Sequence, residues 1–395
     1  MIRFVLLLAL LSAFPPLSTD MYLPAIPFLE KTWQLPLFIV NLTLVFFYIT
    51  YCCSMLVYGP LSDRFGRKPP LISGLLLFIA ASLLCALSNN IWMLIGARII
   101  QGMGAGAASS ISLAMAWDRL PSGQRERVLS QISVIMALAP MISPMFGSLM
   151  LKYLAWNWIF AAQAVLGMIA LGGVFKTRET HAGGTGNSLT ALLQSYQRVL
   201  SNRKLTGLVL CNAIVGLPLF AFIAGSASIY IVGFQLPEIR FSLLFGVNAL
   251  CFMAGAMSCL RFGKKIGTLS MISYGYAGVI LGGIGILFPL INGPFRFTLP
   301  MGLITFSIGL SRPPSNNLVL DQVKKDAGTA SSVMVFSYFL FGALSMIAVS
   351  LDWPDKSFFI GCLAIASGTL SLSLWLMLKN HLHLPATEEK PTETS

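Results

Sequence analysis

Charged side chains are scarce in this chain. Only 10% of its 395 residues are Asp, Glu, Lys or Arg, whereas a typical soluble domain carries about 25%. Hydrophobic residues make up 56%, which is more apolar surface than a soluble fold can bury. One bilayer crossing by a helix takes roughly 20 apolar residues, so the length accommodates about twelve crossings and leaves the remainder for short loops and tails.

Histidine and cysteine patterns that bind metals or catalyse reactions are also missing. The three histidines lie outside the apolar blocks, and the seven cysteines lie inside them without CxxC spacing. No apolar block carries an HExxH motif, a paired-aspartate protease pattern or a Ser/His/Asp set. The sequence therefore argues against a membrane enzyme, and we expect neither a metal nor a cofactor.

The net charge is +12, a value that can indicate a nucleic-acid partner. The basic residues, however, lie between the apolar blocks and not in one patch. With the N-terminus inside, 19 Lys and Arg residues fall in predicted cytoplasmic segments and 2, Arg98 and Arg312, fall in spans. The 5 in periplasmic segments are Lys31, Lys152, Arg240, Arg296 and Lys356. The positive-inside rule then places both termini in the cytoplasm, and we expect a multi-pass protein of the bacterial inner membrane that binds no nucleic acid.

Apolar blocks of spanning length occur twelve times, in two groups of six. The first six lie at about 3–27, 37–59, 70–88, 91–115, 128–150 and 158–175, and the second six at about 205–231, 242–261, 269–291, 297–318, 328–350 and 357–378. Residues 3–11 also have the character of a signal peptide, but apolar character resumes through 21–26, which favours a first span.

The predicted fold is therefore an all-α membrane protein with twelve transmembrane helices in two six-helix halves. We expect an N-terminal bundle at 1–175, a cytoplasmic linker at 176–204, a C-terminal bundle at 205–378 and a cytoplasmic tail at 379–395. A weak internal echo supports duplication: Arg64-Phe-Gly-Arg-Lys recurs 197 residues later as Arg261-Phe-Gly-Lys-Lys, and Asp118 and Asp321 lie 203 apart. Two such halves are one of the repeat plans of secondary transporters, with the substrate site at their interface.

The most specific motif follows the second span, as Gly59-Pro-Leu-Ser-Asp-Arg-Phe-Gly-Arg-Lys-Pro-Pro-Leu71. It resembles the loop signature GxLaDrxGrkxxl of the major facilitator family at every defining position except Ser62. Glycine permits close helix approach or a tight turn, and a carboxylate is stabilised at a helix N-terminus. The resemblance implies that Asp63 docks on the start of the eleventh span at Gly328, and that Arg67 pairs with Asp118. The gating residues implied by this resemblance are Gly59, Asp63, Arg64, Gly66, Arg67, Lys68 and Asp118.

The first span narrows the resemblance. Ser18-Thr-Asp-Met-Tyr-Leu-Pro-Ala-Ile-Pro27 is similar to the opening signature of the bicyclomycin and chloramphenicol resistance (Bcr/CflA) exporters, which implies a drug:proton antiporter. The fifth span resembles the antiporter signature gxxxGPxxGG, with serine in place of two glycines. Because serine is also small, helix packing is expected to survive. The antiporter residues there are Ala139, Pro140, Ser143, Pro144 and Gly147.

Asp20 is the only acidic residue that we place within a span, and an ionisable group there is a functional candidate by default. It is expected to exchange the coupled proton, with the proton-motive force as the energy source. Counting residues at 1.5 Å each puts Asp20 roughly 6 to 10 Å and Arg98 roughly 10 Å below the same membrane face. We therefore expect the two charges to pair, directly or through one water or the cargo.

Polar and aromatic residues of the inward-facing spans predict a largely apolar cavity for small amphiphilic drug-like substrates in a monomeric transporter. A proton-coupled importer of a metabolite such as a nucleoside remains the alternative, because fold does not settle cargo or direction. Arg312 is expected to extend toward the cytoplasm or, less favoured, to line the cavity. The cavity candidates are Tyr22, Asn41, Tyr48, Gln101, Asn212, Phe220, Tyr230, Asn248 and Tyr338.

Overall fold

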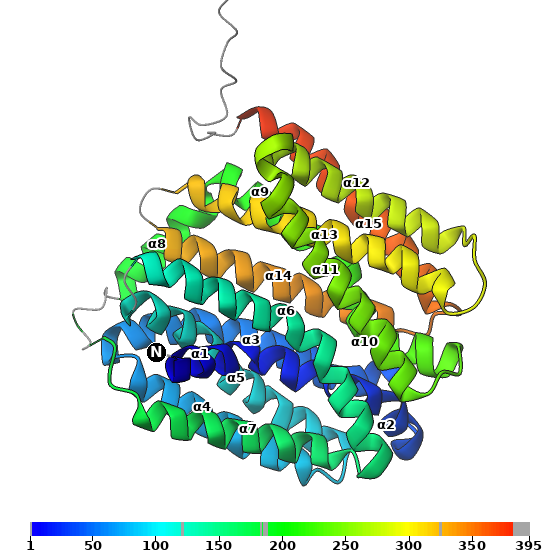
Figure 1. The fold of residues 1–395 in the computed structure, drawn as a ribbon, viewed down its shortest axis with the longest axis horizontal. Helices are drawn as coiled ribbons and strands as arrows, with labels where there is room; N and C mark the ends of the chain where they lie inside the picture. The colour runs from blue at the N-terminus through cyan, green and yellow to red at the C-terminus, as the bar shows by residue number, and fades with distance from the viewer. Residues whose placement is uncertain (1, 120–121, 182–183, 185–188, 324–325, 382–395) are drawn as a thin grey trace, which may run out of the picture.

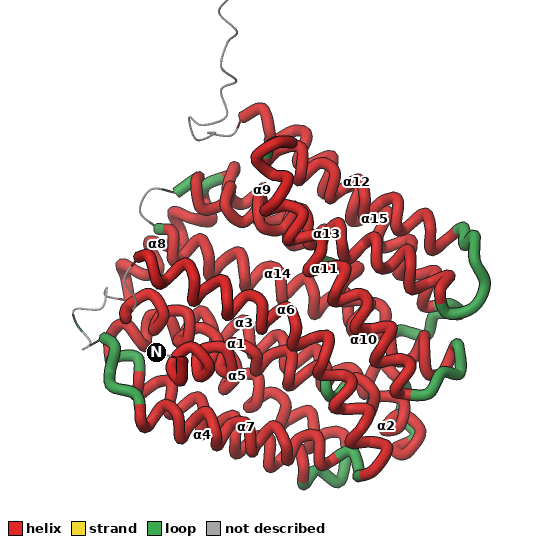
Figure 2. Tube along the Cα trace, viewed as in Figure 1, coloured by secondary structure: helices red, strands yellow, loops and turns green. Residues whose placement is uncertain are grey.

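The computed structural model describes residues 2–119, 122–181, 184, 189–323 and 326–381, and every regular element within these ranges is a helix (Figures 1 and 2). Ten stretches are long and apolar enough to cross a membrane. Two further helices, α6 and α13, have 32 and 27 residues and run beside them. The twelve-span fold is thereby confirmed, while residues 382–395 of the predicted tail lie outside the described residues.

The N-terminal half begins with a compound rod of α1 (Ile2–Asp20), the 3-10 turn η1 (Leu23–Ala25) and α2 (Ile26–Trp33). It continues with α3 (Leu37–Phe65), α4 (Lys68–Ala86), α5 (Ile91–Arg119), α6 (Ser122–Tyr153) and α7 (Asn157–Lys176). The C-terminal half begins with α9 (Arg203–Val215), α10 (Leu217–Ala227) and the π-helical turn η2 (Ser228–Gly233). It continues with α11 (Glu238–Ile266), α12 (Thr268–Leu287), α13 (Phe295–Asp321), α14 (Ala327–Ser350) and α15 (Lys356–Leu378).

The two halves repeat each other with an offset of 201 residues. Gln34 and Gln235 both have φ of 53°, and Gly66 and Gly267 both have φ of 87°. Each glutamine lies in the sequence Gln-Leu-Pro, directly before a helix of 29 residues, α3 or α11. The turn equivalent to Gly66 is therefore Gly267. The sequence repeat that begins at Arg261 is offset by 197 residues from Arg64, and so it begins four residues before the position that is structurally equivalent to Arg64.

The first rod is longer than expected, because the chain stays helical to Trp33 and does not leave the bundle near 24–27. Pro24 lies in the first turn of η1, where its missing N–H leaves no helical hydrogen bond unmade. Asp20 is consequently 13 residues from Trp33, which corresponds to about 20 Å of helix. Within the stretch Arg3–Trp33, Asp20 therefore lies toward the middle of the rod and not near its end.

The linker carries a helix that the sequence reading missed, α8 (Leu189–Ser201). It lies beside α14 and α9 at one end of the bundle (Figure 1). Arg198 of α8 forms an ion pair of 3.0 Å with Asp326, and Ser195 donates a hydrogen bond to the same carboxylate. We call this end, with the α3–α4 loop and α8, the linker end, and the opposite one, with α2, the α2 end.

Candidate functional site

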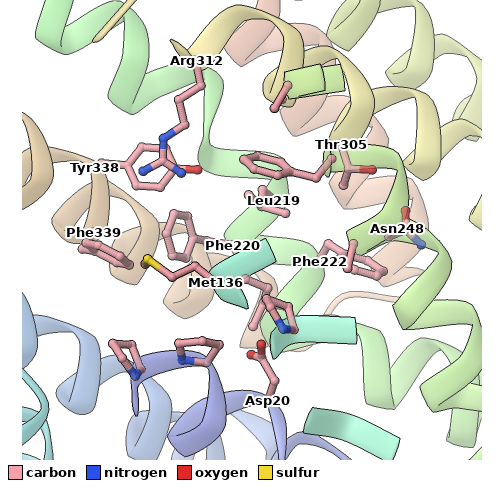
Figure 3. A pocket seen from close by; sticks show the side chains of 18 of the residues that line it. Asp20, Met136, Leu219, Phe220, Phe222, Asn248, Thr305, Arg312, Tyr338 and Phe339 are labelled. Atoms are coloured by element: carbon pink, nitrogen blue, oxygen red, sulfur yellow. The ribbon is translucent and has the colours of Figure 1, made fainter. Parts of the chain in front are cut away.

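A cavity of about 570 Å³ lies between the two halves, lined by α1, α3 and α6 on one side and by α10, α11, α13 and α14 on the other (Figure 3). Its walls are mostly apolar. Of the described residues that line it, Asp20 is the one carboxylate and Arg312 the one base. The aromatic side chains in the lining are Tyr48, Tyr51, Phe220, Phe222, Phe245, Phe252, Tyr338 and Phe339.

Asp20 is only 4% exposed and is reached by a short chain of hydroxyl groups. The Tyr48 hydroxyl donates to Thr19 Oγ1 at 3.1 Å. Thr19 Oγ1 lies 3.0 Å from Asp20 Oδ1 and 2.9 Å from the carbonyl oxygen of Pro15. Since one hydroxyl has one proton, Thr19 can donate to only one of these two acceptors at a time. The arrangement therefore contains a hydrogen bond that can be made to Asp20 or withdrawn from it.

Of the two forms of pairing that the sequence predicted, Arg98 does not form the direct ion pair with Asp20. Its guanidinium is fully buried inside the N-terminal half, where Nη1 donates to the Ser18 carbonyl at 3.0 Å and to Gln101 Oε1 at 2.5 Å. Its Cζ lies 4.3 Å from the ring centroid of Phe47. Arg98 therefore contacts α1 from the interior of the half, whereas the Asp20 carboxyl lines the cavity. Equal depth along two helices does not specify which way each side chain points.

Four of the nine predicted cavity residues line the cavity: Tyr48, Phe220, Asn248 and Tyr338. The prediction is wrong for the other five, which are buried in helix contacts elsewhere. Gln101 bonds Ser82 and Gln163, and Tyr22 accepts a hydrogen bond from Thr43. Asn212 donates to Asn316, Tyr230 bonds Thr298, and Asn41 joins the two halves. Polar side chains inside a membrane bundle must find partners, and most of these found them in another helix.

Arg312 lines the cavity and does not extend out of it, so the favoured expectation is wrong. Its Cζ lies 3.8 Å from the ring centroid of Tyr338, and Figure 3 shows its guanidinium beside that ring. Sequence reasoning also missed Met136, Thr305 and Phe339 in the lining, because an apolar or hydroxyl side chain in a span carries no signal of the direction it faces.

Hydrogen bonds between the halves gather at the α2 end. Asn41 Nδ2 donates to the Ala224 carbonyl at 3.1 Å and to Ser350 Oγ at 2.7 Å. Ser242 Oγ lies 2.6 Å from Ser148 Oγ and donates to the Pro144 carbonyl at 2.8 Å. At the linker end, the described residues form no hydrogen bond between the two helical halves. The halves are thus fastened at the α2 end.

The predicted antiporter element lies in α6 and takes part in this closure. A Cβ at Gly147 would lie 1.9 Å from the carbonyl oxygen of Met21, so glycine is required where α6 crosses the break in the first rod. Pro140 lines the cavity, and Ser143 donates to the carbonyl oxygen of Ala139, one turn earlier in α6. The element therefore positions α6 between the first rod and α11.

The loop signature contains the expected contact between Arg67 and Asp118, with Nε 2.6 Å from Oδ2. Arg67 also pairs with Asp63 and donates to Ser62 Oγ at 2.8 Å. Burial by itself would lower the pKa of Arg67, but its bonds to the two carboxylates, Asp118 first, raise the pKa above its ordinary value. The loop is therefore held to the end of α5 by a buried, permanently charged group.

Two expected contacts of this loop are not formed in this conformation. The Asp63 side chain is 58% exposed and pairs with Arg67, not with the start of α14. At the start of α14, Asp326 instead accepts hydrogen bonds from Ser195 and Arg198 of α8. No described residue lies within 4 Å of a Cβ built on Gly59, so the described part of the chain makes no close helix approach there. Arg64 lies against the ring of Phe65, at 5.4 Å.

Glu179 of the linker caps the N-terminus of α4, a role with no sequence signal. Its carboxylate accepts hydrogen bonds from the backbone N–H groups of Arg67 (2.9 Å) and Lys68 (3.0 Å). Gly66, with φ of 87°, leaves room for it, since a Cβ there would lie 3.1 Å from Glu179 Oε2. In return, Lys68 Nζ donates to the Thr177 carbonyl just beyond α7. Partial burial raises the pKa of Glu179, but four backbone N–H groups outweigh it and hold the pKa below its ordinary value.

The family model described as the Major Facilitator Superfamily matches residues 8–346, and the chain belongs to this family. A Pseudomonas aeruginosa chloramphenicol resistance protein is 28% identical over 93% of this chain and 89% of its own length. A Haemophilus influenzae bicyclomycin resistance protein homolog is 26% identical over 86% and 87%. The multidrug transporter MdfA of Yersinia pestis is 27% identical over 80% and 79%. These relatives confirm the resemblance to drug-resistance exporters.

Solved structures support the fold. The nucleoside transporter NupG superposes with a TM-score of 0.77 at 12% identity, covering 95% of this chain and 99% of that one. A bacterial homolog of the lysosomal transporter Spinster, in an inward-facing and unoccupied conformation, superposes with a TM-score of 0.74 over 97% and 98%. At these identities the likeness is one of fold alone.

Proposed function

We propose that this chain exports small amphiphilic compounds across the bacterial inner membrane in exchange for protons, by alternating access. The observation that carries the proposal is the position of Asp20, a lone carboxylate in an otherwise apolar cavity between two repeated halves. A site of this size fits one drug-sized molecule. The named resistance exporters among the relatives support export as the direction.

The orientation follows from the positive-inside rule. The linker end, with the basic α3–α4 loop, faces the cytoplasm, and the α2 end faces the periplasm. Closure by Asn41 and Ser242 at the α2 end then corresponds to an inward-open state, in which cargo enters from the cytoplasm. Asp63, which here is exposed and pairs with Arg67, is proposed to dock on the start of α14 when the linker end closes.

Proton exchange at Asp20 is proposed to drive the cycle. When Asp20 is ionised, it accepts a hydrogen bond from the Thr19 hydroxyl. When Asp20 is protonated, the Thr19 hydroxyl donates to the Pro15 carbonyl instead. Arg98 supplies a fixed positive charge behind α1, bonded to Ser18. A membrane potential of about 100 mV gives roughly 2.3 kcal/mol per proton and one pH unit about 1.36 kcal/mol. Together they sustain a gradient of a few hundred-fold per neutral molecule, without a cofactor and within a single copy of the chain.

The test is a drug panel on everted vesicles with a pH-sensitive dye. We expect addition of a cargo such as chloramphenicol to release protons from wild-type vesicles, and the isosteric Asp20→Asn variant to insert normally but to release none. Asp352→Asn, an exposed carboxylate outside the cavity, is the matched control and should behave as wild type. Proton-coupled efflux by Asp20→Asn would overturn the coupling role, and cargo uptake in place of efflux would favour the metabolite importer.

A further inference from the structure

Arg312 is a positive charge inside the cavity without a carboxylate partner. It lies on α13, nine residues before the end of that helix at Asp321, or about 13 Å along the axis. Among the described residues, ion pairs within 4 Å join Arg67 to Asp63 and Asp118, and Arg198 to Asp326, and none involves Arg312. Charged side chains inside a membrane bundle are costly and usually paired. An uncompensated arginine in the cavity wall therefore points to a ligand.

The side chain beside it is also incompletely satisfied. Tyr338 is 3% exposed, and apart from its contact with Arg312 its hydroxyl has no hydrogen-bond partner among the described residues. The Tyr338 ring holds the guanidinium at 3.8 Å from its centroid, which orients a planar group without using its N–H donors. Figure 3 shows both side chains bordering the same open space. A guanidinium and a phenol hydroxyl together form a donor set for an oxyanion.

The rest of the cavity defines what carries that oxyanion. Phe220 and Phe339 pack on Tyr338 with ring centroids 5.0 and 5.8 Å away, and Met136 lines the same space. Asp20 lies on the opposite side, on the N-terminal half (Figure 3). The cavity thus has a cationic wall and an anionic wall with aromatic surface between them.

We propose that Arg312 binds a carboxylate of the cargo, so that this transporter prefers aromatic amphiphiles that carry an acidic group, zwitterions included. This inference rests on the proposed function. It names the cargo class of the same cavity and makes Arg312 a specificity-determining residue. A bidentate guanidinium–carboxylate contact should favour the acid over its neutral ester about ten- to hundredfold in binding.

The experiment compares ciprofloxacin with its methyl ester, and chloramphenicol as a neutral reference, in binding to the purified protein in lipid nanodiscs. We expect wild type to bind the acid about ten- to hundredfold more tightly than the ester. Arg312→Gln should abolish this preference and Arg312→Lys should keep part of it. Arg296→Gln, an exposed arginine on the same helix, is the matched control and should leave the preference unchanged.

The outcomes separate this inference from the proposed function. Equal affinity of wild type for acid and ester overturns the role of Arg312, and this comparison needs no variant to fold. The role of Arg312 is also overturned if Arg312→Gln binds both compounds more weakly but still prefers the acid over the ester, since the arginine is then structural. Proton-coupled chloramphenicol efflux with no acid preference would leave the proposed function standing, whereas absence of any coupled transport would remove the proposed function itself.

Discussion

Asn41 offers a test of how the α2 end is closed. The sequence placed this residue in the cavity, but its amide instead donates 3.1 Å and 2.7 Å hydrogen bonds to Ala224 and Ser350 of the other half. Both bonds join the two halves, so the halves can separate at the α2 end only if these bonds break. Replacement by alanine therefore destabilises the closed α2 end without removing a cavity side chain, and it shifts the population toward the state that opens there.

The size of the shift follows from the two bonds. Each intramolecular hydrogen bond contributes about 0.5–1.5 kcal/mol net. Asn41→Ala should therefore destabilise the state closed at the α2 end, relative to the open state, by about 1–3 kcal/mol. That corresponds to roughly a 5- to 150-fold change in the ratio of the two states. Ser350→Ala removes one of the two bonds and should produce about half of the free-energy change.

Single-molecule energy transfer measures this ratio, with dyes on cysteines introduced at Lys31 and Asp352 in a background without the seven native cysteines. Asn212→Ala is the matched control: it also removes a buried asparagine, but its 2.7 Å bond to Asn316 lies within the C-terminal half. An unchanged ratio in Asn41→Ala, or an equal shift in Asn212→Ala, would refute the reasoning.

Three further predictions concern the loop signature and α6. Glu179→Gln should weaken the α4 cap by about 0.5–2 kcal/mol, measured by amide exchange at Arg67 and Lys68, whose N–H groups bond the Glu179 carboxylate. Because the pKa of Glu179 is lowered in the folded chain, this stabilisation is present above the ordinary glutamate range and is lost as pH falls through the depressed pKa, where the two proteins should converge. Gly147→Ala should cost about 1–3 kcal/mol of thermal stability, whereas Gly172→Ala, with nothing within 4 Å of its Cβ, should cost none. Arg67→Ala should slow transport cycling and leave equilibrium cargo affinity nearly unchanged; a large loss of binding would place Arg67 at the cargo site.

Much of the architecture can be read from the residues in order. The twelve apolar blocks predict the twelve rods to within a few residues at most ends, because a bilayer span must be apolar and of nearly fixed length. The signature loop likewise predicts Gly66 in a turn and Arg67 beside Asp118, since both depend on short, local spacing at one helix junction.

The directions of side chains were decided only by the tertiary structure. Asp20 of α1 lines the cavity, whereas Arg98 of α5 is buried inside the N-terminal half, where it bonds the Ser18 carbonyl of α1. The sequence identified Arg312 as unusual but not as a cavity residue, and it gave no signal that Glu179 would cap α4. A hydropathy pattern reports how deep a residue lies in the membrane. Which partner it meets depends on how twelve helices rotate and pack against one another, and that is a property of the assembled bundle.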